Sequence, residues 1–138
     1  MSTEREISYG GVVVRDGEVL VITPAGKPRV RALPKGGAAP EESGEQTALR
    51  EVREETGVDA RVRGELGEVQ YWYRRDGRRI FKTVRFYLCD YRGGDTADHD
   101  HEVEEARWIP LSSARTALSY PGERAMIERA QSRLRADQ

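Results

Sequence analysis

The sequence contains very little cysteine and no clear excess of either charge. Its one cysteine, Cys89, cannot form a disulfide within the chain, which suits a reducing cytoplasm. The net charge is −1, from 23 basic and 24 acidic residues, so the composition indicates neither a general nucleic-acid partner nor a membrane-surface partner. The first residues are polar, without the apolar core of a signal peptide, and no apolar run approaches the roughly 20 residues that cross a bilayer. We therefore expect a cytoplasmic monomer or homodimer that acts on a small molecule.

The chain has the length and apolar content of one domain. Its 138 residues, 37% of them hydrophobic, can bury one core, and no shift in composition marks a linker. We therefore expect a single domain over residues 1–138. Patterns typical of strands flank patterns typical of helices, so the predicted class is α/β or α+β with a mixed sheet.

Turn residues between β-branched runs predict two hairpins. Asp16-Gly17 and Asp76-Gly77 are strong hairpin turn signals. Strands between Gly10 and Ile22 flank the first turn, and strands over 69–73 and 80–89 flank the second. The other expected elements are short strands at 30–33, 58–65 and 107–110, a turn at 34–37, loops at 23–28, 38–42 and 92–100, and helices at 111–117 and 122–135.

A further helix is predicted from Ser43 to Glu55 or Thr56. Ser43, followed three residues later by Gln46, has the form of a capping box. Gly57 is well placed to end the helix, because glycine readily adopts the left-handed conformation found there.

Three glutamates share one face of this helix. Glu51, Glu54 and Glu55 have the spacing i, i+3 and i+4, whereas Leu49 and Val52 fall on a different stripe, toward the core. Three neighbouring carboxylates repel one another, and one nearby arginine cannot neutralise them all. A hard divalent cation with oxygen ligands, Mg²⁺ with Mn²⁺ as a substitute, is the natural partner of such a cluster.

An alternative interpretation is that these glutamates only solvate an exposed helix face, which is the more frequent case for a bare Glu-x-x-Glu-Glu. The glycine-rich segment from Pro34 to Gly37, just before the helix, favours a site instead. It offers close backbone approach, free amides and carbonyls, and the lysine Lys35. A loop of this kind beside carboxylates suits a substrate that carries metal-bound phosphate.

The spacing over residues 36–58 resembles the Nudix box. Gly36, Glu42 and the run from Arg50 to Val58 match the pattern G-x5-E-x7-R-E-U-x-E-E-x-G-U, in which U is aliphatic, at every defined position. The hairpin before the box, the aromatic strands after it and Trp108-Ile109-Pro110 are also similar to this family. The resemblance implies an α/β/α sandwich with a mixed sheet, in which the box forms a loop–helix–loop. It also implies a pyrophosphohydrolase that cuts a phosphoanhydride in a nucleoside diphosphate linked to another group.

The resemblance also assigns roles to residues. The implied metal ligands are Glu51, Glu54, Glu55, the backbone carbonyl of Lys35, and Glu102 from a distant loop. The general base stays open between Glu51, Glu55 and Glu102. In the implied mechanism, Mg²⁺ would neutralise charge on the pyrophosphate and make a water more acidic, that water would attack phosphorus in line as the phosphoanhydride bond breaks, and a carboxylate would take its proton.

Two further residues are expected to position the others. Arg50 matches the arginine that orients the glutamates, and Glu42 matches the glutamate that braces the loop. The expected catalytic set is therefore Arg50, Glu51, Glu54 and Glu55.

The residues outside the box bear on the substrate. Lys82-Thr83-Val84 and the box entry Leu33-Pro34-Lys35-Gly36 resemble the diadenosine polyphosphate hydrolase branch. The expected substrate contacts are Lys35, Lys82, Phe86, Tyr71 and Tyr73. The lysines would hold phosphates and the aromatic rings would stack a base, with burial in the core as the alternative for the rings.

Two charged clusters allow two interpretations each. Arg74, Arg75, Arg78 and Arg79 surround the second hairpin turn. They are either solvated charges or a basic rim that attracts a polyphosphate tail. His99 and His101 alternate with acidic residues and are either exposed loop side chains or part of a zinc site.

Several functions are consistent with these patterns. Dinucleoside polyphosphates are the preferred substrates, followed by oxidised or ordinary nucleoside triphosphates in MutT-like cleansing of the nucleotide pool. ADP-ribose and diphosphoinositol polyphosphates come next. A non-catalytic nucleotide-binding domain would be expected to lack box glutamates, and none is missing here.

Overall fold

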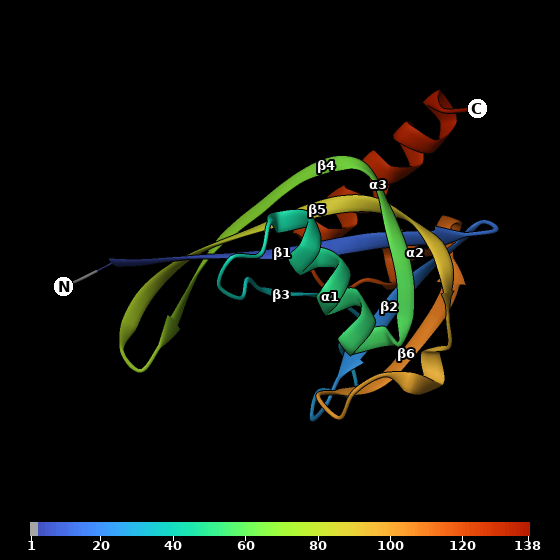
Figure 1. Ribbon diagram of the computed structural model, residues 1–138. Helices are drawn as coiled ribbons and strands as arrows, with labels where there is room; N and C mark the ends of the chain where they lie inside the picture. Colours follow the sequence, from blue (N-terminus) through green and yellow to red (C-terminus); the bar gives the residue numbers. More distant parts are fainter. Residues whose placement is uncertain (1–2) are drawn as a thin grey trace.

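The computed structural model describes residues 3–138, which form six strands, three helices and one short 3-10 turn (Figure 1). The strands are β1 (Thr3–Arg15), β2 (Glu18–Pro24), β3 (Lys35–Gly37), β4 (Val58–Arg75), β5 (Arg78–Gly94) and β6 (Val103–Pro110). The helices are α1 (Gly44–Thr56), α2 (Leu111–Ala117) and α3 (Pro121–Ala136), and the 3-10 turn η1 is Thr96–Asp98.

The strands form one mixed sheet in the order β4-β5-β1-β2-β6, with β3 paired to β1. β1 and β5 are parallel, and the other pairs are antiparallel. Both predicted hairpins are confirmed. Asp16 and Gly17 have φ values of 49° and 78°, and Asp76 and Gly77 have 52° and 77°, so both central residues of each turn have the positive φ that a tight hairpin needs.

Side chains alternate across the sheet and divide the core into two layers. On β1, Val12 and Val14 pack with residues of α2 and α3, whereas Val13 packs with Ala48 and Val52 of α1. One helix therefore covers one face of the sheet, and two helices cover the other (Figure 1). The mixed sheet and the α/β/α sandwich predicted from the sequence are confirmed.

Several segments differ from the predictions. Residues 92–100, predicted as a loop, contain the end of β5 and the 3-10 turn η1, and the strand predicted at 107–110 begins at Val103. Residues 34–37, predicted as a turn, include strand β3, which pairs with Ser8–Gly10 of β1. The strand predicted at 30–33 is reduced to one bridge between Ala32 and Ile22. β4 is one continuous strand rather than two, because register shifts near Gly64 and Gly67 absorb the irregular residues and let pairing with β5 continue.

Cys89 lies in the middle of β5 and is fully buried in the layer that packs against α1. Burial raises the pKa of its thiol to about 12, because the anion would lose its hydration. The thiol is therefore protonated at neutral pH.

Within residues 3–138, none of the helices is both long enough and apolar enough to cross a membrane.

Candidate active site

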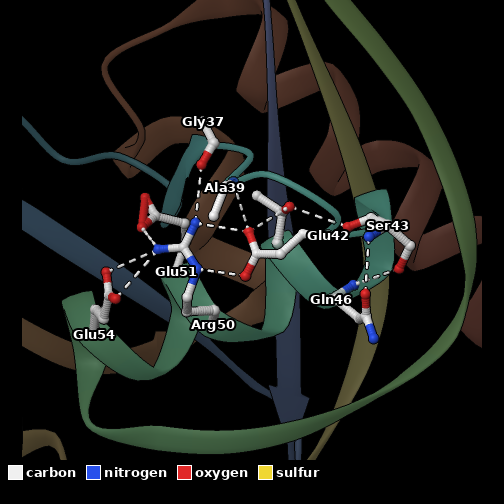
Figure 2. Close-up of polar contacts among 9 residues, drawn as sticks. Gly37, Ala39, Glu42, Ser43, Gln46, Arg50, Glu51 and Glu54 are labelled. Carbon is white, nitrogen blue, oxygen red and sulfur yellow. Dashed lines mark hydrogen bonds and ion pairs between the residues drawn. The ribbon is translucent and has the colours of Figure 1, made fainter.

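Helix α1 has a defined start and a defined end. The Ser43 hydroxyl accepts a hydrogen bond from the Gln46 amide, and the Gln46 side chain accepts one from the Ser43 amide (Figure 2). At the other end, Gly57 has a φ of 77° and donates its amide to Arg53. The predicted capping box and glycine cap are confirmed, so the register of the helix between them is fixed.

Arg50 is the centre of the polar contacts on this helix (Figure 2). Its guanidinium donates to both Glu42 oxygens, at 2.7 and 3.0 Å, and to the Gly37 carbonyl at 2.9 Å. It also donates to Glu51 at 2.8 Å and to Glu54 at 3.2 Å. One arginine therefore connects the loop before the helix to two of the three clustered glutamates.

Glu42 fixes the shape of that loop. Besides Arg50, its carboxylate accepts hydrogen bonds from the Ala39 amide and the Thr47 hydroxyl. The bond from Arg50 is the main reason that the pKa of Glu42 falls to about 2. Glu42 is thus a permanent anion within the loop, as expected for a bracing residue.

Glu51 lies against the backbone of β3. Its side chain is only 14% exposed, and a Cβ added at Gly36 would overlap its carboxylate. A glycine is therefore required at position 36 for the carboxylate to reach this place. Burial raises the pKa of Glu51 to about 7, and the nearby Glu54 carboxyl adds to the shift.

Glu55 also faces β3 and accepts a hydrogen bond from the Lys35 amide at 3.0 Å. Burial raises its pKa to about 8, against the effect of that hydrogen bond, while Glu51 and Asp100 add repulsion. Two neighbouring glutamates therefore hold protons more tightly than free carboxyls do, because no nearby cation offsets their burial fully.

This donor set fits a divalent metal ion. Within residues 3–138 no three acidic, histidine or cysteine side chains are already arranged around one point as ligands. Nevertheless, Glu51 and Glu55 are adjacent and partly buried, and no nearby positive charge fully offsets their burial. Both side chains offer only oxygen atoms as ligands. Hard cations such as Mg²⁺ prefer oxygen ligands.

The raised pKa values give a test of this fit. A carboxyl whose folded pKa exceeds its unfolded value stabilises the fold at low pH and loses that contribution as pH rises. With EDTA present, we expect the melting temperature to fall between about pH 5 and pH 8, the interval between the ordinary value of 4.5 and the pKa values of about 7 and 8.

Mg²⁺ should raise the melting temperature more at pH 8 than at pH 6, and Glu55→Gln should flatten the pH dependence measured in EDTA. Thermal unfolding of the unmodified chain and of Glu55→Gln, at pH 6 and pH 8 with EDTA or Mg²⁺, measures these differences. An equal effect of Mg²⁺ at both values would contradict it.

A cavity of about 700 Å³ opens beside Glu55. Its lining includes the apolar residues Ile22, Ala32, Val69, Val84, Phe86 and Val103, the tyrosines Tyr71 and Tyr120, and the charged residues Lys27, Lys35, Glu55, Glu102 and Glu123. A largely apolar cavity of this size with a few polar groups is typical of a small-molecule site.

The cavity brings together some of the predicted site residues. Glu102, far from the box in sequence, lines the same cavity as Glu55. The amide of Asp100 donates to the Glu54 carbonyl at 2.9 Å, which ties the acidic loop to the end of α1. Tyr71, 42% exposed, and the fully buried Phe86 also line the cavity. Their predicted roles stay predictions.

Two other predicted residues lie away from the cavity lining. The Lys82 ammonium is 3.5 Å from a Glu6 carboxylate oxygen, and the Tyr73 hydroxyl donates to the same carboxylate. Their nearest polar partner is thus Glu6 on β1. His99 contacts the carbonyl of Asp100 through its ring nitrogen.

Glu123 is a site residue that the sequence did not suggest. It is 3% exposed, at the start of α3, and lines the cavity. One oxygen accepts a hydrogen bond from the Leu33 amide at 2.8 Å, and the other is 2.9 Å from the Lys35 ammonium. Burial alone would lower the pKa of Lys35, but Glu123 outweighs it and the pKa is raised. Glu123 therefore holds residues 33–35 in place, and the Lys35 amide of this segment donates to Glu55.

Removing this carboxylate should destabilise the protein. Glu123→Leu leaves the Lys35 ammonium and the Leu33 amide without their partner, and we expect a loss of about 3 kcal/mol, as for other broken buried pairs. The double variant Lys35→Met with Glu123→Leu should be more stable than Glu123→Leu alone, because no unpaired charge remains. Urea unfolding of the single and double variants measures this, and strictly additive losses would contradict it.

Comparison with known proteins gives one family. The model of the NUDIX domain matches residues 5–130. MutT4 of Mycobacterium tuberculosis (strain CDC 1551 / Oshkosh) is 41% identical over 137 residues, which cover 93% of this chain and 55% of that protein. The 8-oxo-(d)GTP phosphatase of Mycolicibacterium smegmatis (strain ATCC 700084 / mc(2)155) is 33% identical over 98 residues, 71% of this chain and 29% of that protein. The chain thus spans about half, or less, of these two relatives.

Among solved structures, the C. elegans Ap4A hydrolase in a binary complex has a TM-score of 0.76 to this chain. The identity is 22%, and the match covers 95% of this chain and 98% of that one. At this identity the likeness concerns the fold, which agrees with the sandwich described above.

Proposed function

Because the chain belongs to the NUDIX family, whose hydrolases act on phosphoanhydride bonds, we propose that it hydrolyses a nucleoside diphosphate linked to a further group, with a divalent cation bound at Glu51, Glu54 and Glu55. The observation that carries this proposal is the position of the cavity. It adjoins Glu55 on one side and offers apolar and aromatic walls on the other. A base would lie in the cavity, with its phosphates directed toward the carboxylates.

The carboxylates of the site would bind the cation and accept a proton. Glu51, Glu54 and Glu55 would hold the cation, with the Lys35 carbonyl and Glu102 as further ligands. When bound, Mg²⁺ neutralises charge on the pyrophosphate and lowers the pKa of a water molecule. The carboxylate that accepts the proton would be Glu51, Glu55 or Glu102.

Arg50 would act as a positioning residue. Its hydrogen bonds to Glu51 and Glu54 hold the two carboxylates in their orientation on the helix, and those to Glu42 and Gly37 hold the guanidinium itself. Such preorganisation matters because catalytic groups displaced by even about 1 Å can lose roughly 100-fold in rate.

For the substrate we place nucleoside triphosphates, oxidised or ordinary, first. One cavity of about 700 Å³ is suited to one nucleoside. Lys82, expected to hold a distal phosphate, is not among the residues that line the cavity and has Glu6 as its ion-pair partner, and its role stays a prediction. The identities to MutT4 and to the 8-oxo-(d)GTP phosphatase support the same order.

Dinucleoside polyphosphates are the second candidate. The specific observation in their favour is the run Lys82-Thr83-Val84, similar to the diadenosine polyphosphate hydrolases, because Val84 of this run lines the cavity. A second nucleoside would then have to lie outside the cavity.

The test is a measurement of kcat/KM with Mg²⁺ for 8-oxo-dGTP, dGTP, ATP, diadenosine tetra- and hexaphosphate, ADP-ribose and a diphosphoinositol polyphosphate. We expect a triphosphate to exceed the diadenosine compounds by tenfold or more. A tenfold preference for a diadenosine compound would reverse the order of the two candidates. The absence of Mg²⁺-dependent turnover on every compound would contradict the proposal as a whole.

A monomeric or homodimeric state and a cytoplasmic location stay predictions.

A further inference from the structure

The arginines at the outer end of the β4–β5 hairpin lie on two different faces of the sheet. On the face that continues from the cavity, Arg75 pairs with Glu6, and Arg78 pairs with Glu4 at 2.7 Å. On the opposite face, strand register places Arg74 beside Arg79. The cluster around the turn is therefore divided into a paired half and an unpaired half.

The unpaired half belongs to a larger surface. Arg5 lies beside Phe81 on β5, which lies beside Trp72 on β4. Ile7 lies beside Thr83, which lies beside Gln70. We call the set Arg5, Ile7, Gln70, Trp72, Arg74, Arg79, Phe81 and Thr83 the aromatic–arginine surface. Among the ion pairs of residues 3–138, none involves Arg5, Arg74 or Arg79.

Large apolar side chains of this surface are exposed to solvent. Trp72 is 50% exposed and Ile7 is 44% exposed. The Trp72 and Phe81 rings are 4.9 Å apart, the Arg79 guanidinium is 4.4 Å from the Trp72 ring, and the Arg5 guanidinium is 5.7 Å from the Phe81 ring. Aromatic rings and free positive charges therefore alternate across neighbouring strands.

Within the described residues 3–138, no helix packs on this part of the sheet. Helix α1 packs on the same face further along the strands, where Tyr9 and Tyr87 contact it at Gly44. The ends of β4, β5 and β1 extend past the helix (Figure 1). Exposed apolar surface of this kind in a folded protein marks a site of interaction more often than chance.

We propose that the aromatic–arginine surface binds single-stranded nucleic acid. Bases would stack on Trp72 and Phe81, and phosphates would contact Arg5, Arg74 and Arg79. Aromatic rings interleaved with positive charge are the usual means by which proteins hold single strands without sequence preference. Gln70 and Thr83 add hydrogen-bonding groups that can reach base edges and that would be unfavourable in contact with lipid.

This surface is independent of the proposed active site. The cavity lies on the opposite face of the sheet, where Val84 and Phe86 line it. The balanced net charge of −1 does not oppose the proposal, because the acidic partners Glu4 and Glu6 lie on the other face. Phosphates would interact with the local charge of this surface rather than with the net charge of the chain.

The probe is a fluorescein-labelled oligouridylate of about 12 nucleotides, long enough for one small site. It carries a 5′-hydroxyl, so that it offers no pyrophosphate to the active site, and EDTA is present throughout. Fluorescence anisotropy at about 50 to 200 mM salt should show binding whose log K falls with log salt at a slope of about −2, since each of three phosphate contacts contributes roughly −0.7.

Variants of the surface should weaken this binding. Trp72→Ala should lower the affinity by about tenfold or more, since one stacked base is lost. Arg5→Gln with Arg79→Gln should reduce the salt slope to about −0.7, the value for one remaining contact. Hydrolysis of the small-molecule substrate should be unchanged in these variants, which also shows that they fold.

The matched control is Arg75→Gln with Arg78→Gln, which removes the same charge from the other face of the same hairpin. It should leave oligouridylate affinity within about twofold, because its arginines are already paired. An equal loss of affinity in this control would overturn the proposal in favour of general charge attraction. Failure of the intact chain to bind oligouridylate would overturn it too, and binding only to phosphatidylserine-containing vesicles would point to a membrane instead.

Discussion

Glu54→Gln should lower turnover in the proposed reaction by roughly a thousandfold while leaving the fold intact. Metal-ion catalysis contributes several kcal/mol, and each tenfold change in rate corresponds to about 1.4 kcal/mol. Glu54 is the most exposed of the three glutamates, at 48%, and its main contact is Arg50, so the amide can replace it without a packing defect. The apparent affinity for Mg²⁺, measured from the dependence of rate on its concentration, should fall as well.

Glu45→Gln is the control for this prediction. Glu45 is an exposed glutamate in the first turn of the same helix, and it is not a box position. Its replacement removes the same charge and should change turnover by less than about twofold. Near-normal turnover in Glu54→Gln would remove this residue from the metal site. A similar loss in both variants would indicate that net helix charge, rather than a specific ligand, limits the rate.

Gly36→Ala should abolish most of the activity even though the change adds only one methyl group. The new Cβ would occupy the place of the Glu51 carboxylate, so that the glutamate must leave its position between β3 and Arg50. We expect kcat to fall by at least about 100-fold, as for other small displacements of catalytic groups. Steady-state kinetics with saturating Mg²⁺ measures the loss.

The neighbouring glycine provides an internal comparison. A Cβ at Gly37 would meet nothing within 4 Å, so Gly37→Ala should keep nearly full activity. Both variants change the backbone preference in the same way, and only one of them places an atom against Glu51. Equal losses in the two variants would show that backbone flexibility of β3, and not the space beside Glu51, is what the reaction requires.

The parts of the fold set by neighbouring residues were predictable. Both hairpins follow from Asp-Gly turns between β-branched runs, and α1 follows from its Ser43 cap and its Gly57 end. These signals act within a few residues, so a sequence pattern contains all of the relevant partners. The shared face of the three glutamates follows from the same helix register, since caps at both ends leave it no freedom to slip.

The contacts that depend on distant partners were not predictable. Glu123 binds an amide 90 positions away, and a glutamate near the start of a helix has no local sign of that partner. In the same way, Lys82 faces Glu6 because β1 and β5 are parallel and in register, a pairing that the run Lys82-Thr83-Val84 alone does not reveal. The continuity of β4 was missed for a related reason, because its bulges interrupt the alternation by which strands are identified.

Because the thiol of Cys89 is buried, the native chain should not react with thiol reagents. Cys89 is protonated, lies on β5 with its side chain packed against α1, and is the only cysteine in the sequence. A maleimide or disulfide reagent can therefore label it only when the sheet and α1 separate, so that the labelling rate reports how often this layer opens. A cysteine introduced at an exposed loop position, for example Arg29→Cys, would react at once and alone. The labelling rate of the unmodified chain thus measures how often the sheet and α1 separate. The variant gives a chain labelled at one surface position, which is suitable for spectroscopy.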